Sequence, residues 1–129
     1  MIRYYTDQEK KIMDSSLLDE QAQKYAQEFS SEQIKLNTSQ LRKFYAEVKS
    51  LERQYAVAVD RPTAFARILP MIKLLKAKSE YAKTRKVVPD SFRSWLWENV
   101  DSIADEKDFR AFLLYFEAVV GFSARYLKD

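Results

Sequence analysis

Apolar residues recur along this chain at steps of three and four, the spacing that places side chains on one face of an α-helix. The pattern is clearest between residues 41 and 55. Asn37 stands just before it as a helix N-cap, and Gln40 is placed to reach back to that cap. A helix over about 38–55 is therefore predicted, with a buried face of Leu41, Phe44, Tyr45, Val48, Leu51 and Tyr55.

Two shorter patterns precede this helix. Thr6 or Asp7 is expected to cap a short helix that runs through Met13. Ser15 and Ser16 then cap a second helix, which the polar stretch 30–35 ends. The predicted buried residues of this second helix are Leu18, Ala22, Tyr25, Ala26 and Phe29.

Prolines divide the second half of the chain. Pro62 breaks the connection 55–63, and Pro70 is best tolerated in a first helical turn, so the next helix is expected to begin near Leu69. A kinked helix from Ala64 is the alternative. Pro89 closes this helix, because the residue before a proline disfavours helical backbone.

Two further helices are predicted after Pro89. Asp90 or Ser91 starts the first. The last helix, about 107–128, is apolar over more than half its circumference, which predicts either a central position or cover by another chain. Gly121 in its middle costs roughly 1 kcal/mol relative to alanine, so a close backbone approach is expected there. The first of these helices should bury Phe92, Trp95, Leu96, Asn99 and Ile103.

The composition supports one all-α domain over residues 1–129, a compact bundle of five or six helices. A single glycine and three prolines disfavour sheets joined by tight turns. The absence of cysteine and histidine removes thiolate and imidazole chemistry, so we expect no catalytic residues, no metal site and no cofactor. Nothing resembles a signal peptide or a membrane span, which favours a cytoplasmic protein with no membrane partner.

Charge is strongly segregated along the chain. Residues 35–89 carry thirteen cations and four anions, whereas residues 1–34 and 90–129 each carry a net charge of −3. A central basic segment between acidic flanks is typical of a surface that faces a polyanion.

The segment 71–86 concentrates this positive charge. On a helical wheel Lys73, Lys76 and Lys83 form one cationic face, and Lys86 follows them. Lys78 and Arg85 instead fall within the arc expected to be buried, which comprises Met71, Leu74, Leu75, Ala77, Tyr81 and Ala82. Two interpretations remain open: snorkelling of the two stems, or cations placed to meet a polyanion at a partly covered surface.

Two more groups of charged residues stand out. Arg42, Lys49 and Arg53 form a stripe on the 38–55 helix that could join the downstream cations in one surface. The second group is acidic and opens the last helix, where anions favour the helix dipole, so we prefer this role to a magnesium site. It comprises Asp101, Asp105, Glu106 and Asp108.

Three blocks in order carry a family resemblance: LNTSQLRKFYAEV at 36–48, LPMIKLLKAKSEYAKTR at 69–85, and FLLYFEAVVGFSARY at 112–126. Together they resemble the small helical subunit of the type III-A (Csm) CRISPR RNA-guided effector complex. The resemblance covers about 36–126 and carries over the cations Arg42, Lys78 and Arg85. The other basic positions come from helix geometry alone.

The resemblance implies a non-catalytic subunit that is present in several copies and self-associates along the complex. Its expected partners are guide RNA, target RNA, and the backbone and large subunits. A basic surface would contact the RNA backbone, since base pairing reads the sequence in guided recognition. The runner-up function is a structural helical adaptor whose basic face binds an acidic protein, and an RNA-hydrolysing enzyme built on the acidic run is third.

Overall fold

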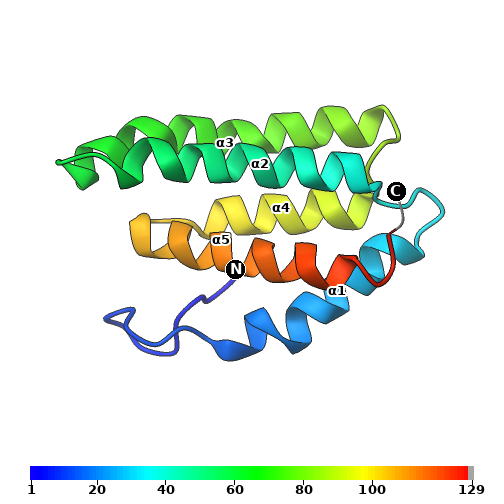
Figure 1. Ribbon diagram of the computed structural model, residues 1–129, viewed down its shortest axis with the longest axis horizontal. Coiled ribbons are helices and arrows are strands. Elements are labelled where there is room, and N and C mark those ends of the chain that lie inside the picture. The colour runs from blue at the N-terminus through cyan, green and yellow to red at the C-terminus, as the bar shows by residue number, and fades with distance from the viewer. Residues whose placement is uncertain (128–129) are drawn as a thin grey trace.

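The computed structural model describes residues 1–127, and its secondary-structure elements in that range are all helices (Figure 1). The predicted bundle is confirmed: five α-helices follow one short 3-10 helix in the described residues. Lys128, the last residue of the expected final helix, lies outside them. The elements are η1 (Ser15–Leu18), α1 (Glu20–Ser31), α2 (Thr38–Ala56), α3 (Arg61–Thr84), α4 (Asp90–Ser102) and α5 (Glu106–Ser123).

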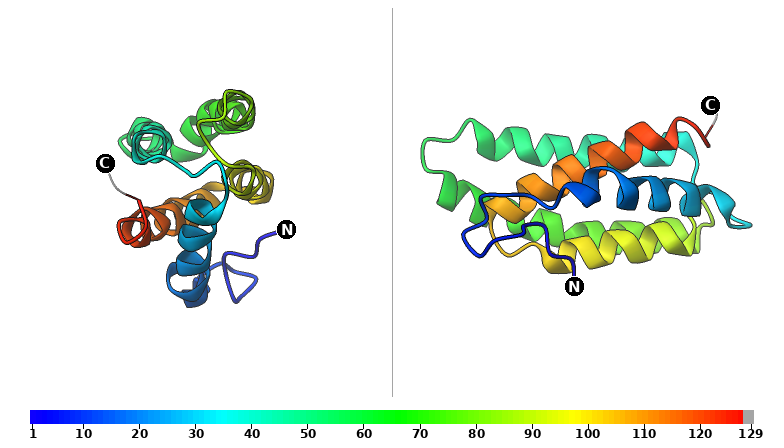
Figure 2. Two further views of the ribbon diagram at one scale, coloured as in Figure 1. Left: turned by 90° about the vertical axis from the view of Figure 1, so that its right-hand side faces the viewer. Right: turned by 90° about the horizontal axis from the view of Figure 1, so that it is seen from below.

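The helices form layers (Figures 1 and 2). Helices α2 and α3 lie antiparallel as a long hairpin, with α3 packed on α4 and α2 packed on α5. Helix α1 covers the side of α5 away from the hairpin. The hairpin therefore forms one outer layer of the molecule.

An aromatic cluster around Trp95 fills the core between α1, α4 and α5. The Trp95 ring lies 5.3 Å from the rings of Tyr115 and Phe116 and 5.7 Å from that of Phe29. These contacts are edge-to-face, the geometry that aromatic quadrupoles favour. All four residues are buried, so the apolar circumference of α5 is explained by its central position.

The N-terminal segment is a loop, so the helix expected through Met13 is wrong. The Asp7 carboxylate accepts hydrogen bonds from the backbone N–H groups of Lys11 and Ile12, at 3.0 and 2.9 Å. A short acidic side chain thus satisfies backbone donors that a helix would otherwise use. The Tyr4 hydroxyl donates to Oδ1 of Asn99 at 2.8 Å and ties the loop to α4.

The next expected helix is divided in two. Ser15 and Ser16 belong to the 3-10 helix, which is capped by the Asp14 carboxylate, and α1 begins only at Glu20. Asp19 separates them with φ of −130° and ψ of −97°, outside the helical region. Because of this break Leu17 is buried and Leu18 is only half-buried, while Ala22, Ala26 and Phe29 are buried as predicted.

Helix α3 begins at Arg61, not near Leu69. Asp60 caps it by accepting from the Thr63 N–H at 3.3 Å, and Pro62 occupies the first turn. Pro70 lies inside the helix, where it removes one donor from the ladder. Pro70 is exposed, so water can reach the carbonyl four residues earlier, which Pro70 leaves without a backbone donor. The kinked alternative from Ala64 was nearer to the observed start.

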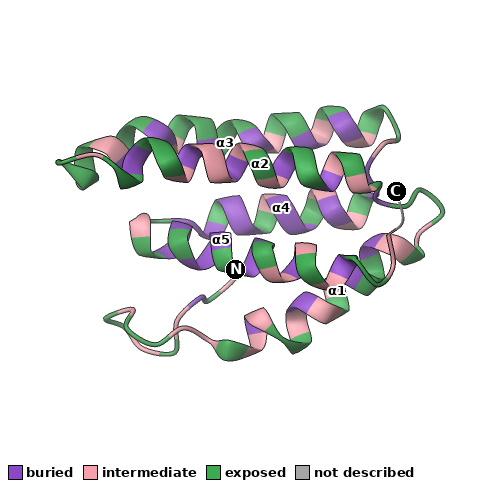
Figure 3. Cartoon of the chain, in the orientation of Figure 1, coloured by how far each residue is buried: buried purple, intermediate pink, exposed green. Residues whose placement is uncertain are grey.

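The expected buried arc of α3 is also wrong in part. Met71, Leu74 and Tyr81 are 44, 41 and 65% exposed, and exposed residues recur along α3 in Figure 3. Because the helix also contains Phe65 and Ile68, its buried face is centred on the side where these residues lie, and Lys78 falls outside that face. That face consists of Phe65, Ile68, Ile72, Leu75, Ser79 and Ala82.

Gly121 does not mark a close backbone approach. A Cβ at this position would meet nothing within 4 Å, and the residue is exposed with negative φ. The glycine therefore costs helix stability without a packing reason in the isolated chain.

Gly121→Ala should raise the free energy of unfolding by about 0.5–1 kcal/mol, because alanine restricts the unfolded chain and favours the helix. Urea denaturation followed by circular dichroism measures the change. Ala46→Gly on exposed α2 is the matched control and should lose a similar amount. If Gly121→Ala has unchanged or lower stability, the conclusion that a side chain fits at this position without contacts would be wrong.

Three acids of the predicted run, Asp105, Glu106 and Asp108, lie at the start of α5, as preferred above, whereas Asp101 lies in α4. Asp105 accepts from the Asp108 N–H at 2.9 Å, and Lys10 Nζ lies 2.7 Å from Asp105 and 3.0 Å from Asp108. Burial opposes ionisation of Asp105, but its hydrogen bonds from Lys10 and from the Asp108 amide hold the pKa below its ordinary value. Within the described residues no group of three or more acids is arranged to hold a metal ion.

Asp105→Asn should make the free energy of unfolding depend less on pH in the acid range. A depressed folded-state pKa stabilises the fold above the unfolded pKa of about 3.9, and this contribution disappears as pH falls through the folded value. Asparagine keeps the N-cap but does not titrate. Wild type should therefore exceed the variant by up to about 1 kcal/mol at pH 5 and converge with it near pH 2. Urea titrations at each pH measure this, and parallel curves would contradict it.

No helix in the described part of the chain is both long and apolar enough to cross a bilayer.

Candidate nucleic-acid interface

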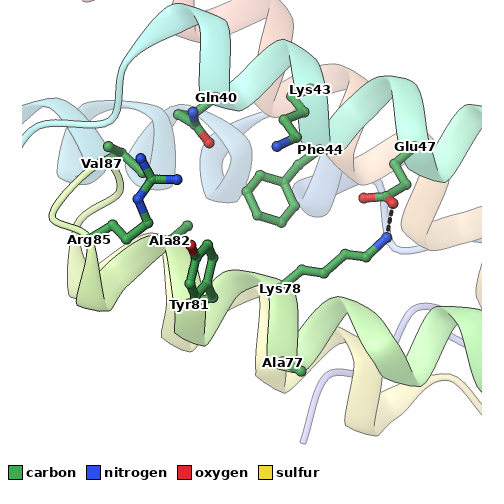
Figure 4. Close-up of a pocket in the computed structure, with 10 residues that line it drawn as sticks. All are labelled: Gln40, Lys43, Phe44, Glu47, Ala77, Lys78, Tyr81, Ala82, Arg85 and Val87. Atoms are coloured by element: carbon green, nitrogen blue, oxygen red, sulfur yellow. Dashed lines mark hydrogen bonds and ion pairs between the residues drawn. The ribbon is translucent and has the colours of Figure 1, made fainter.

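A groove of about 370 Å³ separates the first half of α2 from the last turns of α3 (Figure 4). In Figure 4, Gln40 and Lys43 extend from α2 toward α3, whereas Tyr81 and Arg85 extend from α3 toward α2. The lining residues are Gln40, Lys43, Phe44, Glu47, Ala77, Lys78, Tyr81, Ala82, Arg85 and Val87.

Helical spacing brings these residues together. Gln40, Lys43 and Glu47 follow steps of three and four on α2, and Lys78, Tyr81 and Arg85 do so on α3. The antiparallel hairpin places the start of α2 beside the end of α3. Asn37 fixes that start as predicted, since its side chain accepts from the Gln40 N–H at 3.0 Å.

A lysine in the left-handed backbone conformation follows the end of α3, at the end of the groove. Lys86 has φ of 63°, its N–H donates to the Lys83 carbonyl, and the Val87 N–H donates to the Ala82 carbonyl. This pair of bonds is the Schellman arrangement, in which the residue in the left-handed region is usually glycine. The turn brings Val87 beside Ala82 in the lining of the groove.

Cations outnumber acids in the groove. Lys78 forms an ion pair with Glu47, and the Arg85 guanidinium lies 5.5 Å from the centre of the Tyr81 ring. Neither Lys43 nor Arg85 forms an ion pair with any residue that the structure describes. Lys78 and Arg85 are exposed on the flank of α3, so they are not cations on a buried face and neither needs to snorkel.

The other flank of α3 faces α4, where acids meet two of the predicted cations. Lys76 lies 2.7 Å from Asp101 and 4.6 Å from the centre of the Trp97 ring, and Lys83 lies 3.0 Å from Asp90. Lys73, exposed between the two flanks, forms no ion pair with the described residues. The expected cationic face therefore splits: Lys76 and Lys83 turn toward α4, away from the groove.

The predicted stripe on α2 does not join the groove either. Arg42 lines a separate hollow with Val120 and Ser123 of α5. Lys49 binds Glu52 at 2.8 Å, and this hydrogen bond raises the pKa of Lys49. Arg53 continues the stripe toward the opposite end of α2, exposed to solvent. The sequence left open whether these cations join in one surface, and the tertiary structure separates Arg42 from the groove.

The structure therefore brings together only Lys78 and Arg85 of the nine predicted cations at the groove, with Lys86 just beyond its end. Whether any of the nine contacts RNA stays a prediction. Lys43 and Gln40 of the groove were not predicted from the sequence, and Tyr81 was expected in the core. The buried face of α3 could have been predicted from Phe65, Ile68 and Ile72, which are spaced by three and four residues.

The chain matches the family model described as Csm2 Type III-A over residues 13–129. The match confirms the resemblance found from residue 36 onward and extends it through α1. No curated protein and no solved structure matches the chain. Because the model spans nearly the whole sequence, this chain belongs to the Csm2 family, the small subunit of the type III-A CRISPR Csm effector complex.

Proposed function

We propose that this chain is a non-catalytic subunit that stacks in several copies and binds the backbone of target RNA paired with the guide. Its role is in antiviral defence, and the RNA contact is the basic surface of α2 and α3. The observation that carries the proposal is the groove, where three cations face one carboxylate on an exposed layer of a Csm2-family chain. Phosphate contacts of this kind are independent of sequence, as guided recognition requires.

Surface ion pairs do not prevent such binding. Exposed pairs such as Lys78–Glu47 contribute about 0–1 kcal/mol, so a phosphate can compete for the ammonium group. Each subunit would then bind weakly, and several copies on one RNA would strengthen the whole assembly.

Exposed apolar side chains support contacts with other subunits. Met71 and Leu74 are exposed on α3, and Val57 and Val59 are 84 and 106% exposed in the α2–α3 turn. These residues also favour the runner-up function, an adaptor that binds an acidic protein. The two functions differ in the ligand of the basic surface.

Binding of the full chain to single-stranded RNA of arbitrary sequence should weaken steeply with salt, because each phosphate contact releases counterions. Arg85→Ala and Lys78→Ala should weaken binding more than Lys49→Ala, because Lys78 and Arg85 line the groove and Lys49 does not. Each lost contact should reduce the slope of log K against log salt by about 0.7. Fluorescence anisotropy across a salt series measures both quantities.

Circular dichroism of each variant serves as the folding control. Equal affinities and equal slopes for all three folded variants would contradict a groove-centred contact. An RNA affinity that does not depend on salt would favour the adaptor instead.

Purification of a tagged full chain from its native host should recover guide RNA together with the other Csm subunits. The family membership predicts this assembly. Mass spectrometry and RNA sequencing of the eluate identify the partners. Recovery of the chain alone, or with unrelated acidic proteins, would overturn the proposed function.

A further inference from the structure

We propose that the groove between α2 and α3 holds one base of the target RNA that is left unpaired by the guide, stacked on the ring of Tyr81, with the flanking phosphates on Lys43 and Arg85. This inference rests on the proposed function and names the ligand of its basic surface more closely. It adds a base contact to a surface that would otherwise bind only the backbone.

The exposure of Tyr81 is the first reason. Its side chain is 65% exposed, although it borders a groove and lies on a helix that buries smaller residues such as Ala82. Arg85, one turn further along α3, lies 5.5 Å from the ring centre and restrains its orientation. Aromatic rings held beside cations are the usual platforms for bases in single-strand binding.

The shape of the groove is the second reason. Phe44 and Ala82 contribute buried apolar surface to its lining, 4 and 6% exposed. The volume of about 370 Å³ lies at the small end of the range for ligand sites, about 300–1,000 Å³. A planar base on Tyr81 would cover this apolar lining.

The polar groups are the third reason. Lys43 extends into the groove from α2 opposite Arg85 on α3, so cations stand on both walls (Figure 4). The Gln40 side-chain amide has no hydrogen-bond partner among the described residues and can bond to the edge of a base. An acidic protein would match the cations, but it would leave no role for the exposed ring or the apolar lining.

The test uses two RNA probes of twelve nucleotides with stable abasic ribose residues. One probe is abasic throughout, and the other carries a single central 2-aminopurine. The full-length wild-type chain should bind the base-containing probe at least about fivefold more tightly at equal salt. Stacking on Tyr81 should also quench the 2-aminopurine fluorescence on binding.

Tyr81→Ala should lose both the affinity advantage and the quenching, whereas Tyr81→Phe keeps the ring and should retain both. Both variants should bind the fully abasic probe with the wild-type salt slope, because the backbone contacts are unchanged.

The two proposals fail in different ways. Salt-dependent binding of the abasic probe with no advantage for the base overturns this inference and leaves the proposed function standing. No binding of either probe overturns both. If Tyr81→Ala changes the sedimentation of the free chain and not its RNA affinity, the groove contacts a second copy and the inference is wrong.

Discussion

The packing of α3 between α2 and α4 is the constraint on which the candidate interface depends. Helix α3 buries a face that runs from Phe65 to Ala82, and that burial decides which side chains lie on each flank. Lys78 and Arg85 face α2, while Lys76 and Lys83 face α4. A rotation of α3 by one residue would move every side chain by about 100° and would destroy this division.

Small and polar residues make that packing possible. Ser79 is fully buried on α3, and its Oγ accepts from Nε1 of Trp97 on α4 at 3.0 Å. A buried hydroxyl is tolerated because it is hydrogen-bonded. The same indole nitrogen donates to the Lys76 carbonyl at 3.0 Å, so α4 is fixed against the middle of α3, and the Trp95 cluster in turn fixes α4 against α1 and α5.

This packing determines which cations of α3 lie beside acidic residues. Asp90 and Asp101 on α4 lie against Lys83 and Lys76 and reduce the positive potential on that side. On the α2 side the groove is lined by one carboxylate, Glu47, which pairs with Lys78, and by two further cations, Lys43 and Arg85. The acidic C-terminal part of the chain therefore does more than flank a basic segment, since it confines the positive surplus to the outer hairpin.

The local pattern of residues determined much of this protein. The spacing of Leu41, Val48 and Tyr55 predicted α2, the Asn37 cap predicted its start, and the three blocks indicated the family, because these features depend on neighbours along the chain. Two of the wrong predictions also have local reasons: the Asp7 carboxylate stabilises a loop where a helix was expected, and Pro62 and Pro70 are both accommodated in α3, which begins earlier than expected.

Only the tertiary structure decided which cations meet. Lys43 and Arg85 are far apart in sequence and join only because α2 and α3 are antiparallel neighbours. Tyr81 looked like a core residue because a helical wheel records which residues share a face but not which face is covered. Burial depends on how neighbouring helices pack. For this reason the basic character of the segment could be predicted from the sequence, whereas the groove could not.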